Sequence, residues 1–277
     1  MHKIHTLENG FKYLEVSNTL SHAKIALQGA HIFYYAYKGG ENLLWLSEKS
    51  AYEYGVAIRG GIPLCWPRFG SIDESLQQHG FARTMLFELL SVNENDVSSE
   101  VILKLSDTPE SRALWNHRFE LVVRIVIGKT LQISMSTKNF DEKELFITQA
   151  FHTYFRVSHI SNVVIKGLQN SYYLDTLIDE KHKEREPLRI NQEVDRVYMD
   201  TDDFIYLYDK DRVITLKTIG SASTVVWNPW IEKCSKMSYM DKNAYKEFVC
   251  IESANAFDDF ILIKSKKIHT LSLEVSF

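Results

Sequence analysis

Hydrophobic and polar positions alternate over short distances along most of the chain. Runs of β-branched and aromatic residues are bounded by polar residues, glycine or proline, a pattern that indicates β-strands. The runs that we interpret as strands are Ile25–Leu27 through Tyr34, Val101–Leu105, Leu121–Ile127, Leu131–Thr137, Phe146–Phe151, Val163–Ile165, Phe204–Tyr208, Val213–Leu216, Thr224–Trp227, Phe248–Ile251, Phe260–Ile263 and Leu271–Val275.

The order of these runs predicts an all-β fold. Leu121–Ile127 and Leu131–Thr137 are joined by Gly128-Lys129-Thr130 and predict a hairpin. Helical periodicity is scarce, with Pro109–His117 as its best example, and the alternating charges of Asp179–Glu186 predict a solvated loop. Strands without regular βα alternation favour a large antiparallel β-sandwich. No linker-like stretch divides the chain, so we expect residues 1–277 to form a single domain.

Composition and charge narrow the function classes. The chain has 277 residues and a formal net charge of −4, from 32 lysines and arginines against 36 acidic residues. This slight acidity argues against nucleic acid or an anionic membrane as the partner, because both need a clustered basic face. No stretch approaches the roughly 20 apolar residues that a membrane span requires, and the N-terminal residues MHKIHTLENGFKYLEV do not have the pattern expected of a secretion signal. We expect a cytoplasmic monomer.

The cysteines support the same location. Cys65, Cys234 and Cys250 are an odd number and show no C-x-x-C spacing. This fits reduced thiols in a cytosolic protein.

Glycine, proline and arginine gather in one segment. Five of the 12 glycines lie between positions 55 and 80, together with Pro63 and Pro67. Arg59, Arg68 and Arg83 fall in or beside the same segment. Arginine binds phosphate or carboxylate through a planar fork, so a glycine-shaped loop with two arginines is a candidate anion site. Pairing with surface carboxylates is the alternative, and residue type alone favours it.

Two ionisable residues interrupt apolar strands elsewhere. His152 lies in the aromatic run Phe151–Phe155, where it is either a core histidine or a general acid or base in a cleft. Glu252 follows the apolar run Phe248–Ile251. Glutamate is almost never fully buried unless it is paired or functional, so Glu252 is the stronger candidate for catalysis.

Other residues are weaker candidates. Asp175 has a simpler explanation as a turn former. Trp66 and Trp227 are aromatic residues that either stack on a sugar ring or pack in the core.

Several site classes lack their usual sequence motifs. The chain has no G-x-x-x-x-G-K-[ST], G-x-G-x-x-G or G-x-S-x-G string, which are typical of P-loop, dinucleotide-binding and α/β-hydrolase proteins. Histidine spacings H-x-H and H-x-x-x-H are also absent, so we predict no metal site. Cys65 as a nucleophile would need a partner base that the sequence does not supply.

Five ordered strings carry a family resemblance. IRGGIPLCWPRFG, QHGFAR, FHTYFRV, VVWNPWIEK and FVCIESAN are spread from position 58 to 255. Together they resemble the aldose 1-epimerase (galactose mutarotase-like) superfamily, and within it the glucose-6-phosphate 1-epimerase branch. The resemblance implies a single antiparallel β-sandwich and an enzyme without a cofactor that interconverts the α and β anomers of a hexose 6-phosphate.

The resemblance also implies roles for individual residues. Glu252 would be the general base and His152 the general acid of sugar-ring opening. Further residues match substrate-binding positions: Arg59 and Arg83 for the phosphate, Gln78 and His79 for the sugar, and Asp175 for sugar hydroxyls. Arg68 departs from the family pattern, which is apolar or aromatic there, and would widen anion recognition if it faced the pocket.

Three alternatives stay open at this point. The protein could be an aldose 1-epimerase that acts on unphosphorylated sugars, or a sugar phosphate-binding protein without activity. A glycoside hydrolase that uses Glu252 and Asp175 is the third alternative, and it requires both carboxylates in one cleft.

Overall fold

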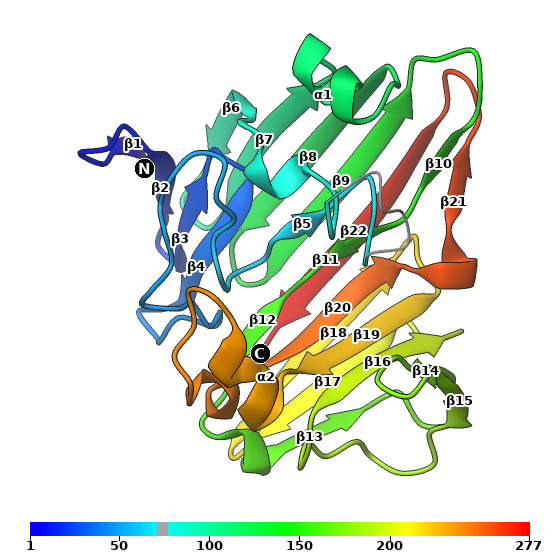
Figure 1. Ribbon diagram of the computed structural model, residues 1–277. Coiled ribbons are helices and arrows are strands. Elements are labelled where there is room, and N and C mark those ends of the chain that lie inside the picture. Colours follow the sequence, from blue (N-terminus) through cyan, green and yellow to red (C-terminus); the bar gives the residue numbers. More distant parts are fainter. Residues whose placement is uncertain (71–76) are drawn as a thin grey trace.

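Two eight-stranded sheets dominate the computed structural model, which describes residues 1–70 and 77–277 (Figure 1). The site sheet, named for the cavity described below, has the strand order β15-β14-β16-β19-β20-β11-β5, and β12 also pairs with β20. Its strands are β5 (Leu64–Cys65), β11 (Gln149–Phe151), β12 (Tyr154–Arg156), β14 (Tyr172–Asp175), β15 (Glu180–Lys183), β16 (Val194–Met199), β19 (Ser223–Asn228) and β20 (Phe248–Asn255).

The backing sheet has the order β13-β17-β18-β22-β9-β8-β7-β6. Its strands are β6 (Glu88–Glu94), β7 (Ser99–Ser106), β8 (Phe119–Ile127), β9 (Leu131–Asn139), β13 (Val163–Lys166), β17 (Phe204–Asp209), β18 (Arg212–Ile219) and β22 (Ile268–Ser276).

Smaller elements complete the described chain. Strands β1 (His2–Thr6), β2 (Lys12–Ser17), β3 (Ser21–Ala26) and β4 (His31–Tyr37) form a four-stranded sheet, and β10 (Leu145–Ile147) pairs with β21 (Ile261–Ile263). The helices are α1 (Pro109–Leu114), α2 (Trp230–Lys236) and the 3₁₀ turns η1 (Ala82–Thr84), η2 (Ile160–Asn162), η3 (Ala244–Lys246) and η4 (Phe257–Asp259).

The main core lies between the two large sheets. Val226 and Ile251, which are paired on β19 and β20, belong to one buried apolar cluster with Leu121, Ile133 and Leu273 of the backing sheet. Successive side chains of a strand point to opposite faces. The residues next to Val226 and Ile251 in sequence therefore face away from this core.

The strand pattern confirms the antiparallel β-fold. The ladders of both large sheets are antiparallel, and Leu121–Ile127 pairs with Leu131–Thr137 as the predicted hairpin. Strand β9 alternates buried and half-buried residues, as a strand with one covered face should. Strand β20 is instead buried at every position, because both of its faces are covered.

The element boundaries differ from the sequence prediction at several places. Asp179–Glu186 is not a simple loop, since β15 pairs with β14 as an edge strand, where charged side chains remain solvated. The expected run Phe146–Phe151 is divided between β10 and β11. Phe248–Ile251 continues to Asn255, so Glu252 lies within a strand rather than at its end.

Helices and N-terminal strands also differ from expectation. Helix α1 ends at Leu114 instead of His117, and the segment predicted as a strand through Tyr34 is a hairpin of β3 and β4. Several elements were not predicted, because most of them are short or lack a continuous apolar run: helix α2 and strands β1, β2, β5, β6, β12, β14 and β16. In the described ranges, none of the helices has the length and apolar character needed to cross a membrane.

The arginine-rich segment is held against the site sheet by backbone contacts. The N–H of His152 donates to the Pro63 carbonyl at 3.0 Å, and the N–H of Tyr154 donates to the Gly61 carbonyl at 2.9 Å. Strand β5 then pairs with β11 through Leu64 and Phe151. These bonds place the loop that carries Arg59 directly beside His152.

Gly80 lies in a tight turn against the backbone of Trp66. It has φ +68°, and a Cβ atom there would lie 2.2 Å from the carbonyl oxygen of Trp66. Neither the backbone angle nor the space accepts a side chain. The turn that carries Gln78 and His79 therefore depends on glycine at position 80.

We predict that Gly80→Ala lowers the free energy of unfolding by more than about 3 kcal/mol, because backbone strain and overlap with Trp66 add. The matched control is Gly10→Ala, which has φ +85° but nothing within 4 Å of the new Cβ. It should cost only about 1–2 kcal/mol. Equal losses for the two variants in denaturant unfolding would contradict the assigned packing.

Candidate active site

A cavity of about 500 Å³ opens on the face of the site sheet away from the main core. This volume is typical of a site for a small molecule. Its floor is formed by side chains that pair across neighbouring strands: Asp195 with Trp227, Val197 with Val225, and Val225 with Glu252. The register of three strands, β16, β19 and β20, therefore sets the shape of the floor.

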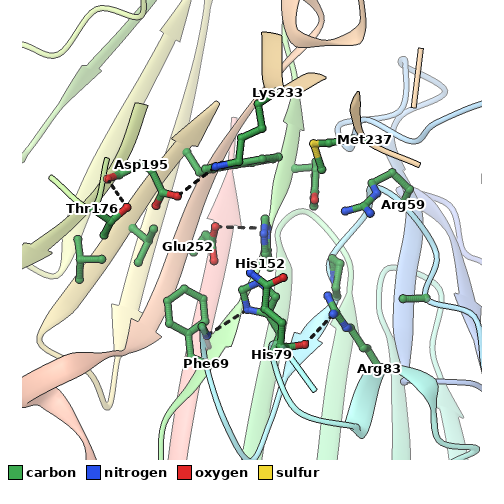
Figure 2. Close-up of a pocket in the computed structure, with 18 of the residues that line it drawn as sticks. Arg59, Phe69, His79, Arg83, His152, Thr176, Asp195, Lys233, Met237 and Glu252 are labelled. Atoms are coloured by element: carbon green, nitrogen blue, oxygen red, sulfur yellow. Dashed lines mark hydrogen bonds and ion pairs between the residues drawn. The ribbon is translucent and has the colours of Figure 1, made fainter. Parts of the chain in front are cut away.

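His152 and Glu252 lie together at the centre of this cavity (Figure 2). Nδ1 of His152 is 3.3 Å from Oε1 of Glu252. The two residues are only 8% and 1% exposed. Nδ1 of His152 and Oε2 of Glu252 are buried and have no hydrogen-bond partner among the described residues. Such unsatisfied atoms are costly in a core but available to a ligand.

Aromatic rings fix the orientation of His152. Its ring stacks on Tyr154 at a centroid distance of 4.8 Å and an interplanar angle of 8°. Trp227 approaches edge-on at 5.7 Å. The imidazole therefore has little freedom to rotate away from Glu252.

Burial favours the neutral form of both members of this pair in the free protein. Desolvation raises the pKa of Glu252 well above its ordinary value, and the negative charge of Asp195 raises it further. Desolvation also lowers the pKa of His152, and the positive charges of Arg83 and Arg59 act in the same direction. Both shifts favour a protonated carboxyl group beside an unprotonated imidazole, which is one acid beside one base.

Arg59 and Arg83 line the same cavity on one side of this pair (Figure 2). Their Nε atoms are buried without a hydrogen-bond partner in the described structure. A terminal nitrogen of Arg83 donates to the Gln78 carbonyl at 2.8 Å, which orients its guanidinium group. The surface-pairing alternative for these two arginines is therefore wrong: they point into a cavity.

The turn before Gly80 adds two further residues to the cavity wall. Gln78 is exposed at its rim, and His79 has φ +66°. Nδ1 of His79 accepts a hydrogen bond from the Gly70 N–H at 3.2 Å, so the neutral ring carries its proton on Nε2. Burial, with Arg83 and Arg59, lowers the pKa of His79 to about 3. His79 is therefore a neutral hydrogen-bond donor at physiological pH.

Asp195 lines the cavity although sequence reasoning did not single it out. Its carboxylate lies 3.7 Å from the ammonium group of Lys233 on α2, and its backbone carbonyl accepts a bond from the Thr176 hydroxyl at 3.1 Å. Burial raises the pKa of Asp195, while Lys233 opposes that shift. The polar alternation of β16 gave no reason to choose Asp195 over its neighbours, because only the pairing with β19 aims it at the cavity.

Asp175, the acidic residue that the family resemblance selected, is not among the cavity-lining residues. It pairs across strands with Arg196, and its carboxylate lies 3.5 Å from Nε of that residue. Arg196 follows Asp195 in the same strand, so the two point to opposite faces of the sheet. The shape of the cavity therefore gives no support to the predicted sugar contact of Asp175. The glycoside hydrolase alternative loses its proposed carboxylate pair for the same reason.

Trp66 and Arg68 also have other surroundings. Trp66 is fully buried, and its indole N–H donates to the Thr137 hydroxyl at 2.9 Å in the main core. Arg68 donates to the Phe146 carbonyl at 2.6 Å, and its guanidinium lies over the Phe146 ring. Neither residue lines the cavity, so these positions oppose a sugar contact, whereas Trp227 does line it.

The raised pKa of Glu252 leads to a prediction about stability. A carboxyl group with a raised folded-state pKa contributes stability that is fully present below its ordinary pKa of 4.5 and is lost as the pH rises toward the folded-state value. Glutamine keeps the shape but does not ionise. Glu252→Gln should therefore melt at a higher temperature than the wild type, and the difference should grow from pH 4 to pH 8.

The matched control is Glu186→Gln, which changes an exposed glutamate. Its melting temperature should follow that of the wild type at each pH. A stability difference for Glu252→Gln that is constant between pH 4 and pH 8 would show that Glu252 is not held neutral by burial.

Comparison with known proteins identifies similar chains. A protein of Escherichia coli (strain K12) that is provisionally named glucose-6-phosphate 1-epimerase is 34% identical over 256 residues, which cover 89% of this chain and 84% of that protein. A provisionally named glucose-6-phosphate 1-epimerase of Cenchrus ciliaris is 35% identical over 249 residues, 84% of this chain and 74% of its own length.

A solved structure shows the same fold. The crystal structure of a provisionally assigned mutarotase from Salmonella typhimurium superimposes with a TM-score of 0.93 at 30% identity, and covers 99% of this chain and 92% of that one. The family described as aldose 1-epimerase matches residues 12–276. The chain belongs to the aldose 1-epimerase family and is an isomerase that interconverts sugar anomers.

Proposed function

We propose that this protein interconverts the α and β anomers of glucose 6-phosphate or a related hexose 6-phosphate. One observation carries the proposal: the His152–Glu252 pair and the guanidinium groups of Arg59 and Arg83 line a single cavity. The relatives named for glucose 6-phosphate support the choice of a phosphorylated sugar.

The arginines supply the phosphate end of this site. Each has a buried Nε–H without a protein partner, and a phosphate oxygen would satisfy it. Besides burial, the positive charges of Arg59 and Arg83 lower the pKa values of His79 and His152. Both arginines therefore lie close enough to influence the imidazole of His152 electrostatically. A sugar whose 6-phosphate contacts the arginines would extend over His152 and Glu252.

The central pair supplies the acid and the base. Ring opening needs one group to remove the proton of the C1 hydroxyl while another protonates the ring oxygen as the C1–O5 bond breaks. Rotation about C1–C2 then presents the other carbonyl face, and the two groups exchange roles on closure. His152 and Glu252, 3.3 Å apart, offer one proton-donating and one proton-accepting group, as this cycle requires.

Phosphate binding would also prepare the pair electrostatically. Arg59 and Arg83 lower the pKa of His152 in the free protein. A phosphate dianion between them would cancel this effect and favour imidazolium beside carboxylate. In that state His152 is the acid and Glu252 the base, the roles implied by the family resemblance.

Polar groups on the remaining walls would hold the sugar hydroxyls. Asp195 offers a carboxylate acceptor, and His79 offers its Nε2–H as a donor. Trp227 would pack against the sugar ring. Asp195 thereby takes the role in binding sugar hydroxyls that the family resemblance implied for Asp175.

We also propose that the protein acts in the cytoplasm as a monomer. Cys65, Cys234 and Cys250 are all unpaired and buried in the structure, which is in keeping with a reducing compartment.

The first test of this function is anomerisation itself. Freshly dissolved α-glucose 6-phosphate should equilibrate faster with the protein than in buffer, as followed by polarimetry. Glu252→Gln should lower kcat by about 10²–10⁴-fold because it removes proton transfer but keeps the shape of the cavity. Glu186→Gln is the control and should keep full activity. A folded wild-type protein that gives no acceleration would refute the proposal.

The second test concerns the phosphate. Arg59→Ala and Arg83→Ala should each raise KM for glucose 6-phosphate by about 10–100-fold, since each loses a charge-assisted bond of about 1.5–3 kcal/mol. Activity on unphosphorylated glucose should change little. Arg68→Ala is the matched control, because this arginine belongs to the same segment but does not line the cavity. Equal losses on both sugars would contradict the phosphate assignment.

A further inference from the structure

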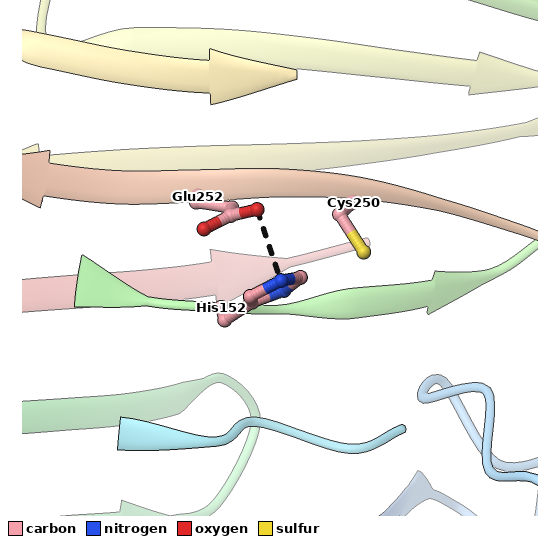
Figure 3. Close-up of side chains that lie close together, drawn as sticks. All are labelled: His152, Cys250 and Glu252. Carbon is pink, nitrogen blue, oxygen red and sulfur yellow. Dashed lines mark ion pairs between the residues drawn. The ribbon is translucent and has the colours of Figure 1, made fainter. Parts of the chain in front are cut away.

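A third potential metal ligand lies beside the catalytic pair. Cys250 is two residues before Glu252 on β20, so both side chains lie on the same face of the site sheet. One atom each of His152, Cys250 and Glu252 lies within 4.8 Å of the others (Figure 3). All three residues are buried. Cys250 itself is not among the residues that line the cavity.

This donor set suits zinc. Zn²⁺ prefers tetrahedral sites of imidazole nitrogen, thiolate sulfur and carboxylate oxygen, at about 2.0–2.3 Å from the metal. Tetrahedral angles at these lengths place neighbouring ligand atoms about 3.3–3.6 Å apart. The separation between His152 and Glu252 is already 3.3 Å. The Cys250 sulfur, now within 4.8 Å of the other two ligand atoms, would complete three ligands by moving closer to them.

The ligand atoms are free to accept a metal. Nδ1 of His152 and Oε2 of Glu252 are buried and lack hydrogen-bond partners in the described structure. Both residues border the cavity, which supplies an entry path and space for a water molecule as the fourth ligand. A site with three protein ligands and one open position is typical of exchangeable or catalytic zinc.

Charge balance favours the replacement of protons by zinc at this site. Zinc binding would release one proton from the Glu252 carboxyl and one from the Cys250 thiol, while His152 binds as neutral imidazole. The dication replaces two protons, so the net charge of the buried site does not change. The nearby arginines, which oppose a proton on His152, therefore add little net repulsion against the metal.

We propose that His152, Cys250 and Glu252 form an inhibitory Zn²⁺ site in the substrate-free protein. The bound metal occupies the acid and base of the reaction, so zinc and sugar phosphate exclude each other. The inhibition rests on the proposed function, whereas zinc binding does not.

The experiment measures binding and activity separately on the full-length protein. Zinc binding is measured by calorimetry with zinc chloride, with and without excess glucose 6-phosphate. Inhibition is measured by NMR exchange between the two anomers, because this assay needs no coupling enzyme that zinc could affect. Cobalt(II) is the spectroscopic probe, since a thiolate ligand gives a charge-transfer band in the near ultraviolet.

We expect one zinc ion to inhibit competitively with glucose 6-phosphate, and a chelator to restore activity. Cys250→Ala should weaken zinc binding and inhibition at least tenfold, remove the cobalt–thiolate band and keep basal activity. Cys250→Ser serves if the alanine variant does not fold. Cys234→Ala is the matched control, because Cys234 is a buried thiol whose Sγ contacts the Asp241 carbonyl instead.

Two results would overturn the proposal. One is zinc affinity and inhibition that are unchanged in the Cys250 variants. The other is zinc that binds without competition from the sugar phosphate, which would place it at another site. A protein without epimerase activity that still shows the cobalt–thiolate band and competition would refute the proposed function and retain the metal site.

Discussion

The site depends on a carboxyl group that is held in a desolvated position. Glu252 is 1% exposed in the middle of β20, between strands that are themselves buried. A buried carboxyl group without full hydrogen bonding opposes folding, and the surrounding sheet must compensate for it. The cooperative packing of the two large sheets supplies that compensation. The cost of burying Glu252 raises its pKa well above the ordinary value, as is common for ionisable groups at functional sites.

The cavity exists because a loop is folded over a rigid sheet. Strands β16, β19 and β20 present alternate residues to the floor, and residues of 59–70 and 77–83 line another wall. Backbone bonds to Pro63 and Gly61 tie this wall to the strands that carry His152 and Tyr154. The acid, the base and the arginines therefore keep fixed positions relative to one another, because each is attached to the same hydrogen-bonded framework. Such preorganisation is what positions catalytic groups before a substrate binds.

The two ends of the cavity carry opposite charges. Positive charge from Arg59 and Arg83 lies on one side of the central pair, and the carboxylate of Asp195 lies on the other (Figure 2). The first lowers the pKa of His152 and the second raises the pKa of Glu252. A bound anion would change this balance directly. The same geometry brings Cys250 close enough to make the pair a candidate zinc site.

Much of this protein follows from sequence alone. Alternation of apolar and polar residues was sufficient for most strands of the backing sheet and for the β8–β9 hairpin, because a strand with one covered face must repeat every two residues. The sequence also singled out Glu252 and His152, because each is an ionisable residue in or beside an apolar run, and such residues are rarely buried unless they are paired or functional.

Tertiary structure decided which polar residues share the cavity. Asp175 and Asp195 are both aspartates that the sequence pattern does not distinguish. Cross-strand register places their side chains on opposite faces of one sheet. Arg68 and Trp66 belong to the same motif as Arg59, yet packing turns them toward Phe146 and the core. Local pattern determines that a residue lies in a strand. The face that it occupies depends on pairing with strands far away in the chain, and only the folded sheet establishes that pairing.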